Sequence, residues 1–272
     1  MPVVCNSPII SNVEAGNEVF LMMLKAPEIA FNCRPGNFVQ IKIDFPDGGL
    51  WGRPFSILNS DGENIRILYK TLGRGTKALS GYQTGRTLSI LGPLGNNFSV
   101  PDKGSTVLLA GGGIGVPPLY YMATNLLRRG ISRTDIHFFN GAGNYDSLVF
   151  LDQIAELKIN TYAVTEDGTM GIKGLITEGI SQFLRAAESA GELKRIMIYS
   201  CGPMPMLKAI AGLASHYGVA CEMALEALMP CGSGVCMGCV VKIRNENHPD
   251  RYSFQRVCHD GPVFKSCEVL WD

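Results

Sequence analysis

The stretch Thr106-Val-Leu-Leu-Ala-Gly-Gly-Gly-Ile-Gly-Val-Pro-Pro118 decides the fold of this 272-residue chain. Its apolar run ends in glycines, and residues 119–129 then show helical spacing. This succession is typical of a buried strand that leads through a tight turn into a helix, whose first N–H groups favour the phosphates of a dinucleotide. The charge-free segment 104–127 is long enough to cross a membrane, but its central glycines and prolines favour strand, turn and helix. We therefore expect no membrane association.

Downstream of this stretch, short apolar runs alternate with helical segments. The predicted strands are 106–110, 135–139, 160–164 and 195–199, and the predicted helices are 119–129, 148–157, 174–188 and 203–216. Alternation of this kind predicts a parallel sheet with helices packed against it. We assign residues 101–220 to an α/β nucleotide-binding domain.

Upstream, the pattern consists of short strands between turn residues. Residues 38–44 alternate strictly between apolar and polar side chains, as a half-buried strand requires. Further strands are predicted at 53–58, 64–70 and 86–91, and residues 75–82 form the only helix expected there. This spacing is typical of an antiparallel barrel or sandwich. We assign residues 1–100 to an antiparallel β-barrel domain.

Four cysteines near the C-terminus have the spacing of iron–sulfur ligands. Cys231, Cys236 and Cys239 form a C-x4-C-x2-C pattern, and Cys258 follows after eighteen residues. This spacing resembles the plant-type pattern for a [2Fe–2S] cluster. A structural zinc site is the alternative, although its ligands usually form two similar C-x2-C pairs. Residues 221–272 are the predicted cluster domain, with Cys267 as a rival fourth ligand.

Two segments of the predicted barrel suit an anionic cofactor. Arg53-Pro54-Phe55-Ser56 lies on a strand and offers a cation beside a hydroxyl group. Gly73-Arg-Gly75-Thr76 opens the short helix, where exposed N–H groups favour phosphate. Each motif is weak alone, because Arg-Pro in a strand is common at a sheet edge.

The α/β domain carries two further turn motifs. Gly111-Gly112-Gly113-Ile-Gly115-Val-Pro117 departs from the Rossmann fingerprint, because Val116 occupies the third glycine position. Cys201-Gly202-Pro203-Met204 ends a later strand and begins a helix. A tight turn without a ligand is the structural alternative for the first motif. The segment 140–146 contains no basic residue to bind a 2′-phosphate, which favours NADH over NADPH.

These motifs together resemble the ferredoxin-NADP reductase superfamily: Arg-Pro-x-Ser, Gly-x-Gly-Thr, a Gly-Pro-Leu-Gly segment at 92–95, the Gly-x-Gly-x-x-Pro turn and Cys-Gly-Pro. The resemblance implies a flavin-binding barrel in which Arg53 contacts the FAD pyrophosphate and Ser56 approaches flavin N5. It also implies a cysteine, Cys201, beside the nicotinamide. The other implied FAD and NAD contacts are Pro54, Phe55, Leu68, Tyr69, Lys70, Gly75, Thr76, Gly111, Gly112, Gly113, Gly115, Pro117, Gly202, Pro203 and Met204.

The order of the three domains is similar to that of the electron-transfer subunits of NAD-dependent bacterial dihydroorotate dehydrogenases. The distinguishing phrases are the cysteine segment 229–241 and Arg256-Val-Cys258-x-Asp-Gly-Pro-Val-Phe264. The resemblance implies electron flow from NADH through FAD and a [2Fe–2S] cluster to a catalytic subunit that carries FMN and forms orotate. It further implies a heterotetramer.

Other functions fit parts of the chain. Subunits of NADH-dependent ferredoxin reductases and sulfide dehydrogenases share the architecture, but often carry aspartate where Cys231 stands. A non-catalytic zinc-bearing interaction protein is the alternative from another class. Zero net formal charge and the lack of a basic run argue against nucleic acid. Nine cysteines and no visible secretory signal predict a reducing, cytoplasmic location.

Overall fold

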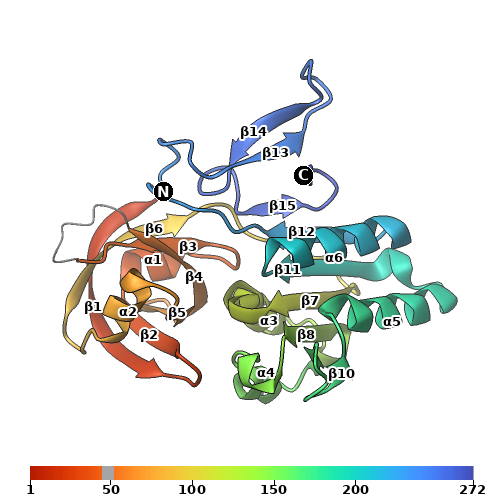
Figure 1. Cartoon of the computed structure of the whole chain (residues 1–272), viewed down its shortest axis with the longest axis horizontal. Coiled ribbons are helices and arrows are strands. Elements are labelled where there is room, and N and C mark those ends of the chain that lie inside the picture. The colour runs from red at the N-terminus through yellow and green to blue at the C-terminus, as the bar shows by residue number, and fades with distance from the viewer. Residues whose placement is uncertain (45–51, 272) are drawn as a thin grey trace.

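The structure is a computed structural model that describes residues 1–44 and 52–271. Its N-terminal part is a closed antiparallel barrel with the strand order β1-β2-β5-β4-β3-β6 (Figure 1). The strands are β1 (Val3–Glu14), β2 (Val19–Lys25), β3 (Phe38–Ile41), β4 (Arg53–Ser60), β5 (Asn64–Lys70) and β6 (Thr87–Leu94). Because side chains alternate along each strand, Ile41, Ile57 and Ile67 all point into the barrel and are fully buried.

Two short helices accompany the barrel, so the expectation of a single helix there was wrong. Helix α2 (Arg74–Ser80) is the predicted one, and α1 (Pro27–Asn32) was missed. Helix α1 begins with a proline in its first turn, where the missing N–H costs nothing, and it buries Ile29 and Ala30. Six residues are too few to show a helical period in the sequence.

The central part is a seven-stranded sheet with the order β10-β9-β8-β7-β11-β12-β15. Its strands are β7 (Thr106–Gly112), β8 (Ile136–Ala142), β9 (Asn160–Thr165), β10 (Ile172–Lys173), β11 (Ile196–Cys201), β12 (Ala220–Ala224) and β15 (Val263–Lys265). All neighbours are parallel except β15, which is antiparallel to β12. The strand order reverses between β7 and β11, and ligands bind at such switch points, outside the carboxyl ends of the strands.

Helices cover both faces of this sheet. They are α3 (Val116–Arg128), α4 (Leu151–Glu156), α5 (Ile176–Ser189) and α6 (Met204–Tyr217), with short 3-10 turns η1 (Gly113–Gly115), η2 (Arg133–Asp135), η3 (Tyr145–Ser147) and η4 (Leu193–Arg195). Strand β7 is buried on both sides: Leu108 belongs to the core formed with α5 and α6, and Leu109 to the core formed with α3. A continuous apolar run is therefore required at β7.

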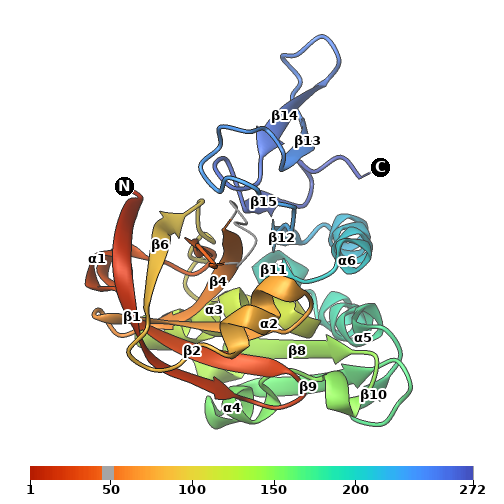
Figure 2. The ribbon, with the colours of Figure 1, turned by 60° about the vertical axis from the view of Figure 1, so that its left-hand side comes forward.

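The C-terminal segment leaves the sheet after β12, forms the hairpin β13 (Val240–Arg244) and β14 (Tyr252–Arg256), and returns as β15. The hairpin stands out from the rest of the molecule (Figures 1 and 2). The predicted fold class is confirmed: an antiparallel barrel, a parallel α/β sheet and a small C-terminal unit. The exact domain boundaries stay a prediction. Within residues 1–44 and 52–271, no helix is both long and apolar enough to cross a membrane.

Candidate cofactor sites

The predicted flavin residues of β4 lie at the start of the strand, and their side chains point alternately to its two sides. Phe55 is buried in the barrel and meets the Tyr69 ring edge-on at a centroid distance of 5.6 Å. Pro54 and Ser56 are half-buried on the opposite side of the strand, and Arg53 is exposed. The outer side therefore offers a flat surface and a hydroxyl, and the exposed Arg53 at the first position of the strand adds a cation, which together suit a planar anionic cofactor.

The predicted residues of β5 divide in the same way. The Tyr69 hydroxyl donates to Asn12 Oδ1 at 2.9 Å inside the barrel, and burial raises the pKa of Tyr69 to about 12. Leu68 packs instead against residues of the α/β core. Lys70 lines the cleft described below. Because the Tyr69 hydroxyl already has a partner, a cofactor beside β5 would meet the backbone of this residue.

One residue of the predicted phosphate-binding motif at helix α2, Thr76, already accepts hydrogen bonds from within the protein. Thr76 Oγ1 accepts the N–H groups of Leu72 at 2.9 Å and of Gly73 at 3.2 Å. These bonds cap the start of the helix. Gly75 is buried in the first turn. The predicted phosphate contact of Thr76 would therefore have to share its hydroxyl with the helix cap.

A cleft of about 420 Å³ lies where the carboxyl ends of the central strands face the barrel. Its lining includes Lys70, Gly112, Gly113, Gly141, Glu166, Pro203 and Met206. Close packing explains two glycines of the turn beside the cleft. A methyl group on Gly115 would lie 2.3 Å from the Cys201 carbonyl oxygen, and one on Gly112 would lie 2.5 Å from Met206 Sδ. The glycine turn at 112–115 thus lies closer to the chain segment after β11 than a side chain at Gly112 or Gly115 would allow.

The remaining predicted nucleotide residues lie behind or beside this cleft. Gly111 and Pro117 pack in the interior next to the turn. Met204 is different: it lines a separate groove with Val240 and Phe254, beside the C-terminal hairpin. Of the predicted nucleotide residues, Gly112, Gly113 and Pro203 thus line the cleft, whereas Met204 lines the separate groove.

Cys201 ends strand β11 with a neutral thiol. Burial raises the pKa of this thiol far above its usual range, and the nearby carboxylate of Glu226 raises it further. Glu226, which follows β12, is a residue that the sequence reasoning missed. Its side chain keeps contact with solvent, but the surrounding protein raises its pKa by partial burial. The feature of the sequence that could have identified Glu226 is its position just past the carboxyl end of a strand.

Three of the predicted cluster cysteines, Cys231, Cys236 and Cys239, lie in the loop before β13, and Cys258 follows β14. Burial acts to raise the pKa of Cys231, but the N–H groups of Cys236 and Ser233 outweigh burial and lower it to about 6. Cys239 Sγ, at the end of the same loop, accepts the N–H of Cys258 from the other loop at 3.4 Å. Cys236 Sγ accepts the N–H of Gly238 at the same distance.

This arrangement fits a two-iron cluster. When four cysteines ligate a [2Fe–2S] cluster, each iron takes two thiolates, and the neighbouring thiols Cys231–Cys236 and Cys239–Cys258 would provide them. Backbone N–H donors already surround the sulfurs, as iron–sulfur loops require. Within the part of the chain that the structure describes, no three His, Cys, Asp or Glu side chains are grouped to hold a single metal ion. The rival ligand Cys267 is exposed, at the turn after β15.

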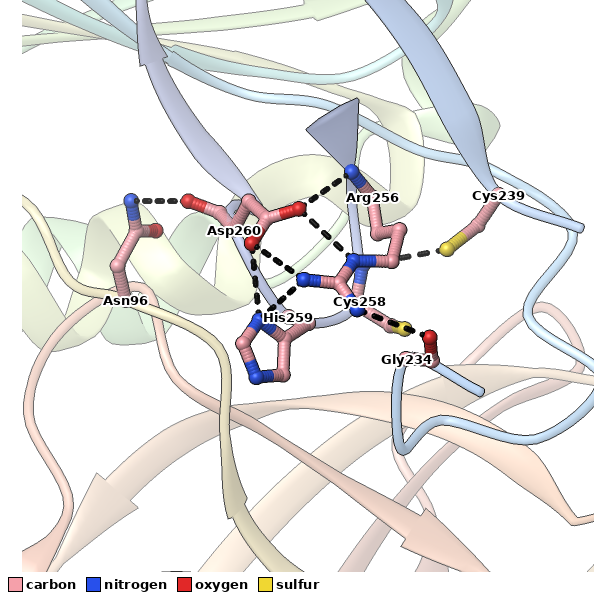
Figure 3. A network of polar contacts seen from close by, with 7 residues as sticks. All are labelled: Asn96, Gly234, Cys239, Arg256, Cys258, His259 and Asp260. Atoms are coloured by element: carbon pink, nitrogen blue, oxygen red, sulfur yellow. Dashed lines mark hydrogen bonds and ion pairs between the residues drawn. The ribbon is translucent and has the colours of Figure 1, made fainter. Parts of the chain in front are cut away.

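Arg256 joins the two cysteine loops through an ion pair within one loop and a hydrogen bond to the other (Figure 3). Arg256 Nε and Nη2 donate to the two carboxylate oxygens of Asp260 at 2.9 and 3.0 Å, which holds the pKa of Asp260 well below its usual range. Arg256 Nη1 donates to the carbonyl oxygen of Gly234 at 3.1 Å. From the barrel, Asn96 Nδ2 donates to the Asp260 carbonyl oxygen at 3.2 Å. One arginine thus fixes both loops, and the barrel fixes the second.

Comparison with known protein families gives two matches along the chain. The iron–sulfur cluster binding domain of dihydroorotate dehydrogenase B matches residues 226–270, and the oxidoreductase NAD-binding domain matches residues 109–212. Both ranges agree with the loops and the cleft described above.

Comparison with individual proteins covers nearly the whole chain. This chain is 35% identical over 269 residues to the dihydroorotate dehydrogenase B (NAD(+)) electron transfer subunits of Bacillus cereus strain G9842 and Bacillus anthracis strain CDC 684. The alignment covers 97% of this chain and 98% of each relative. A solved structure of an NADH-dependent reduced ferredoxin-NADP oxidoreductase is 28% identical, with a TM-score of 0.82, and covers 98% of this chain and 90% of that one. The Amycolatopsis cytochrome P450 reductase GcoB, at 20% identity and a TM-score of 0.66, shares the fold over 79% of this chain and 66% of its own.

Proposed function

The chain belongs to the family of dihydroorotate dehydrogenase B electron-transfer subunits, and from this premise we propose how its residues perform that function. It is an NADH-dependent flavin and iron–sulfur oxidoreductase subunit with FAD, NAD and a [2Fe–2S] cluster as cofactors. The observation that carries the proposal is the pairing of four thiols in two loops that both touch the flavin-type barrel. We place FAD on residues 1–100, NAD on 101–220 and the cluster on 221–272.

FAD, when bound, accepts the two electrons of a hydride from NADH and releases them singly towards the cluster. The chain supplies the positions for this chemistry. Arg53 would hold the pyrophosphate, and Ser56 would direct its hydroxyl to the reactive edge of the flavin. The glycine turn at 111–115 and Pro203 would hold NADH across the cleft, with Cys201 and Glu226 bordering the nicotinamide. The buried, neutral thiol of Cys201 adds a small apolar surface and no charge there.

Coenzyme choice is supported by the charges at the cleft. Glu166 lines it just beyond β9, and a carboxylate at such a place accepts hydrogen bonds from ribose hydroxyls and repels a 2′-phosphate. This supports NADH, as the family name of the relatives does.

The acceptor is a catalytic partner subunit. We propose that it carries FMN, oxidises dihydroorotate to orotate, and assembles with this chain into a heterotetramer. Exposed apolar side chains around the cluster loops support docking there: Leu228, Val235 and Met237 are 86, 82 and 50% exposed. Exposed apolar groups that cluster beside a functional centre are typical of protein interfaces. We place the complex in the cytoplasm, where thiolate ligands are kept reduced.

Co-purification with the catalytic subunit tests the proposal. The wild-type chain should bring down an FMN-containing partner and contain one FAD, two irons and two acid-labile sulfides. Val235→Asp should weaken that association by about tenfold or more, because it places a charge in an apolar contact. Leu72→Asp, at a similarly exposed apolar residue on the barrel, is the matched control and should associate normally. Reduction of a free ferredoxin by NADH, with no association with the dihydroorotate-oxidising subunit, would favour the NADH-dependent ferredoxin reductases instead.

A further inference from the structure

A buried glutamine lies between the flavin strand and the cluster loop. Gln40 belongs to β3, is only 6% exposed, and pairs with Pro54 of β4 in the barrel ladder. Its side chain reaches out of the barrel to both neighbours. A methyl group on Gly52, next to Arg53, would lie 2.6 Å from Gln40 Cγ, and one on Gly232, next to Cys231, would lie 3.0 Å from Gln40 Oε1. Two glycines thus make room for one glutamine.

The orientation of this amide is fixed by its partner. Gln40 Nε2 donates to the carbonyl oxygen of Met229 at 3.1 Å, two residues before Cys231. The reverse orientation would place two acceptors against each other, so Nε2 must face Met229. Gln40 Oε1 then faces Gly232, and it is buried with no hydrogen-bond partner among the residues that the structure describes. An unpaired buried acceptor is costly, and such groups are concentrated at functional sites.

We propose that Gln40 is the positioning residue for electron transfer from FAD to the cluster, an inference that rests on the proposed function. The step moves one electron from reduced FAD to the oxidised cluster, with no heavy-atom bond formed or broken. The second electron follows after the cluster has passed the first to the partner subunit. Gln40 holds the Cys231 loop against the strand that carries Arg53 and Ser56, and so sets the separation and orientation of the two centres.

The free oxygen of Gln40 also predicts the sign of an electrostatic effect. It presents the negative end of the amide dipole to the loop of Cys231. A negative dipole end disfavours the added electron of the reduced cluster, because it raises the energy of extra negative charge nearby. Removing this oxygen should therefore make the reduction potential of the cluster more positive.

Two substitutions distinguish the effect of the Gln40 donor, Nε2, from that of its acceptor, Oε1. Gln40→Met keeps the length of the side chain and removes both polar groups, whereas Gln40→Glu keeps an acceptor and loses the donor to Met229. Ser60→Ala is the matched control, because Ser60 is equally buried in the barrel and donates to the Ala30 carbonyl oxygen at 2.8 Å, away from both cysteine loops. Each protein is assayed for FAD, iron and labile sulfide, mixed rapidly with NADH while flavin and cluster absorbance are followed separately, and titrated for the cluster potential by electron paramagnetic resonance.

In Gln40→Met, flavin reduction by NADH should stay close to the wild-type rate, while cluster reduction slows by about tenfold or more, as misplacement of reacting centres does. The potential should shift to a more positive value in Gln40→Met and not in Ser60→Ala. Gln40→Glu should lose cluster iron more readily than Gln40→Met, because two acceptors would face each other at Met229. Loss of the cluster from Gln40→Met with FAD retained would support the same role.

Unchanged cluster reduction and potential in Gln40→Met would overturn the proposal. Equal slowing of flavin and cluster reduction would also overturn it, because that result indicates a general effect on the barrel. A wild-type chain without FAD or labile sulfide is a separate result, which would refute the proposed function itself.

Discussion

At the scale of single residues, burial does not separate the proposed ligands from the packing thiols, because Cys258 is as buried as Cys221 and burial raises the pKa of both. Burial raises the pKa of Cys221 to about 12 and keeps it, like Cys201, a neutral thiol. Cys231 differs because backbone N–H groups surround its sulfur and lower its pKa. The chain has nine cysteines, and their spacing, rather than their burial, assigns four of them to the cluster.

Serine substitutions test which cysteines ligate the cluster. Cys231→Ser, Cys236→Ser, Cys239→Ser and Cys258→Ser should each lose most of the cluster iron and labile sulfide, because one iron would lose a thiolate. Cys267→Ser is the matched control and should keep both. Iron and sulfide are measured in anaerobically purified protein. Retention of the full cluster in Cys258→Ser, with loss in Cys267→Ser, would show that the fourth ligand has been misassigned.

Arg53 and Ser56 are predicted to act on different parts of FAD. Arg53→Ala should weaken FAD retention by about tenfold or more, because a charge-assisted contact to phosphate is lost. Ser56→Ala should keep FAD and slow its reduction by NADH by about tenfold, the effect of one hydrogen bond near the reacting atom. FAD content after gel filtration and the rate of flavin bleaching separate the two effects. Equal FAD retention in both variants would contradict these roles.

At the scale of secondary-structure elements, the cluster unit is two loops held by a hairpin and one strand. The β13–β14 pair carries Cys239 at one end and leads into Cys258 at the other. Strand β15 then pairs with β12, so the second loop is anchored to the nucleotide sheet. The loops themselves contain little regular structure, and their positions depend on Arg256 and its partners.

Replacing the arginine tests this dependence. Arg256→Met should release cluster iron to a chelator about tenfold faster than the wild type, because the contacts to Asp260 and Gly234 are lost together. Lys265→Met removes an exposed pair with Glu268 at 3.5 Å in the same unit and serves as the control. Iron release is followed by chelator absorbance at fixed protein concentration. Identical release rates in the two variants would show that the ion pair does not hold the loops.

The sheet should carry a pH dependence of its own through His137 on β8. Burial lowers the pKa of His137 from its usual value of 6.5, and its ring packs edge-on against Phe183 at 4.6 Å. As the pH falls below 6.5 the unfolded chain takes up the proton first, so stability present above that pH is lost on acidification. His137→Phe should lack this loss. The variant loses the hydrogen bond to the Tyr162 hydroxyl at every pH, so the check is the change in the urea midpoint between about pH 8 and about pH 5.5, which should be smaller in the variant than in the wild type.

At the scale of the whole molecule, the three units fix a direction of electron flow. The nucleotide cleft and the cysteine loops lie at different places around the barrel, and the loops carry the exposed apolar side chains. NADH is thus expected at one site and the partner subunit at another, with the flavin strands between them. A hydride needs direct contact between nicotinamide and flavin, and an iron–sulfur cluster accepts only single electrons.

Removal of one cofactor at a time tests this order. A cluster-free Cys231→Ser protein should still show flavin reduction by NADH at close to the wild-type rate, and it should fail to reduce the partner subunit. Protein stripped of FAD should retain a cluster that NADH does not reduce. Rapid mixing with NADH, with flavin and cluster absorbance followed separately, measures both. Cluster reduction at an undiminished rate without FAD would contradict the order.

The sequence alone determined the fold class, the cofactors and the family. Glycine turns, strand alternation and cysteine spacing are local patterns, and each reflects a constraint that acts over a few neighbouring residues. Several elements escaped this reasoning: α1 has too few residues for a period, β15 has only three, and the longer strands β1 and β2 were not predicted either.

Only the tertiary structure brought distant residues together. Gln40 looks like an ordinary polar position of a barrel strand in the sequence, and its contact with Met229 spans 189 positions. Glu226 beside Cys201, and Asn96 beside Asp260, depend in the same way on how strands and loops pack. Local chemistry is encoded in the order of residues, whereas the environment of a side chain depends on chain segments that meet only after folding.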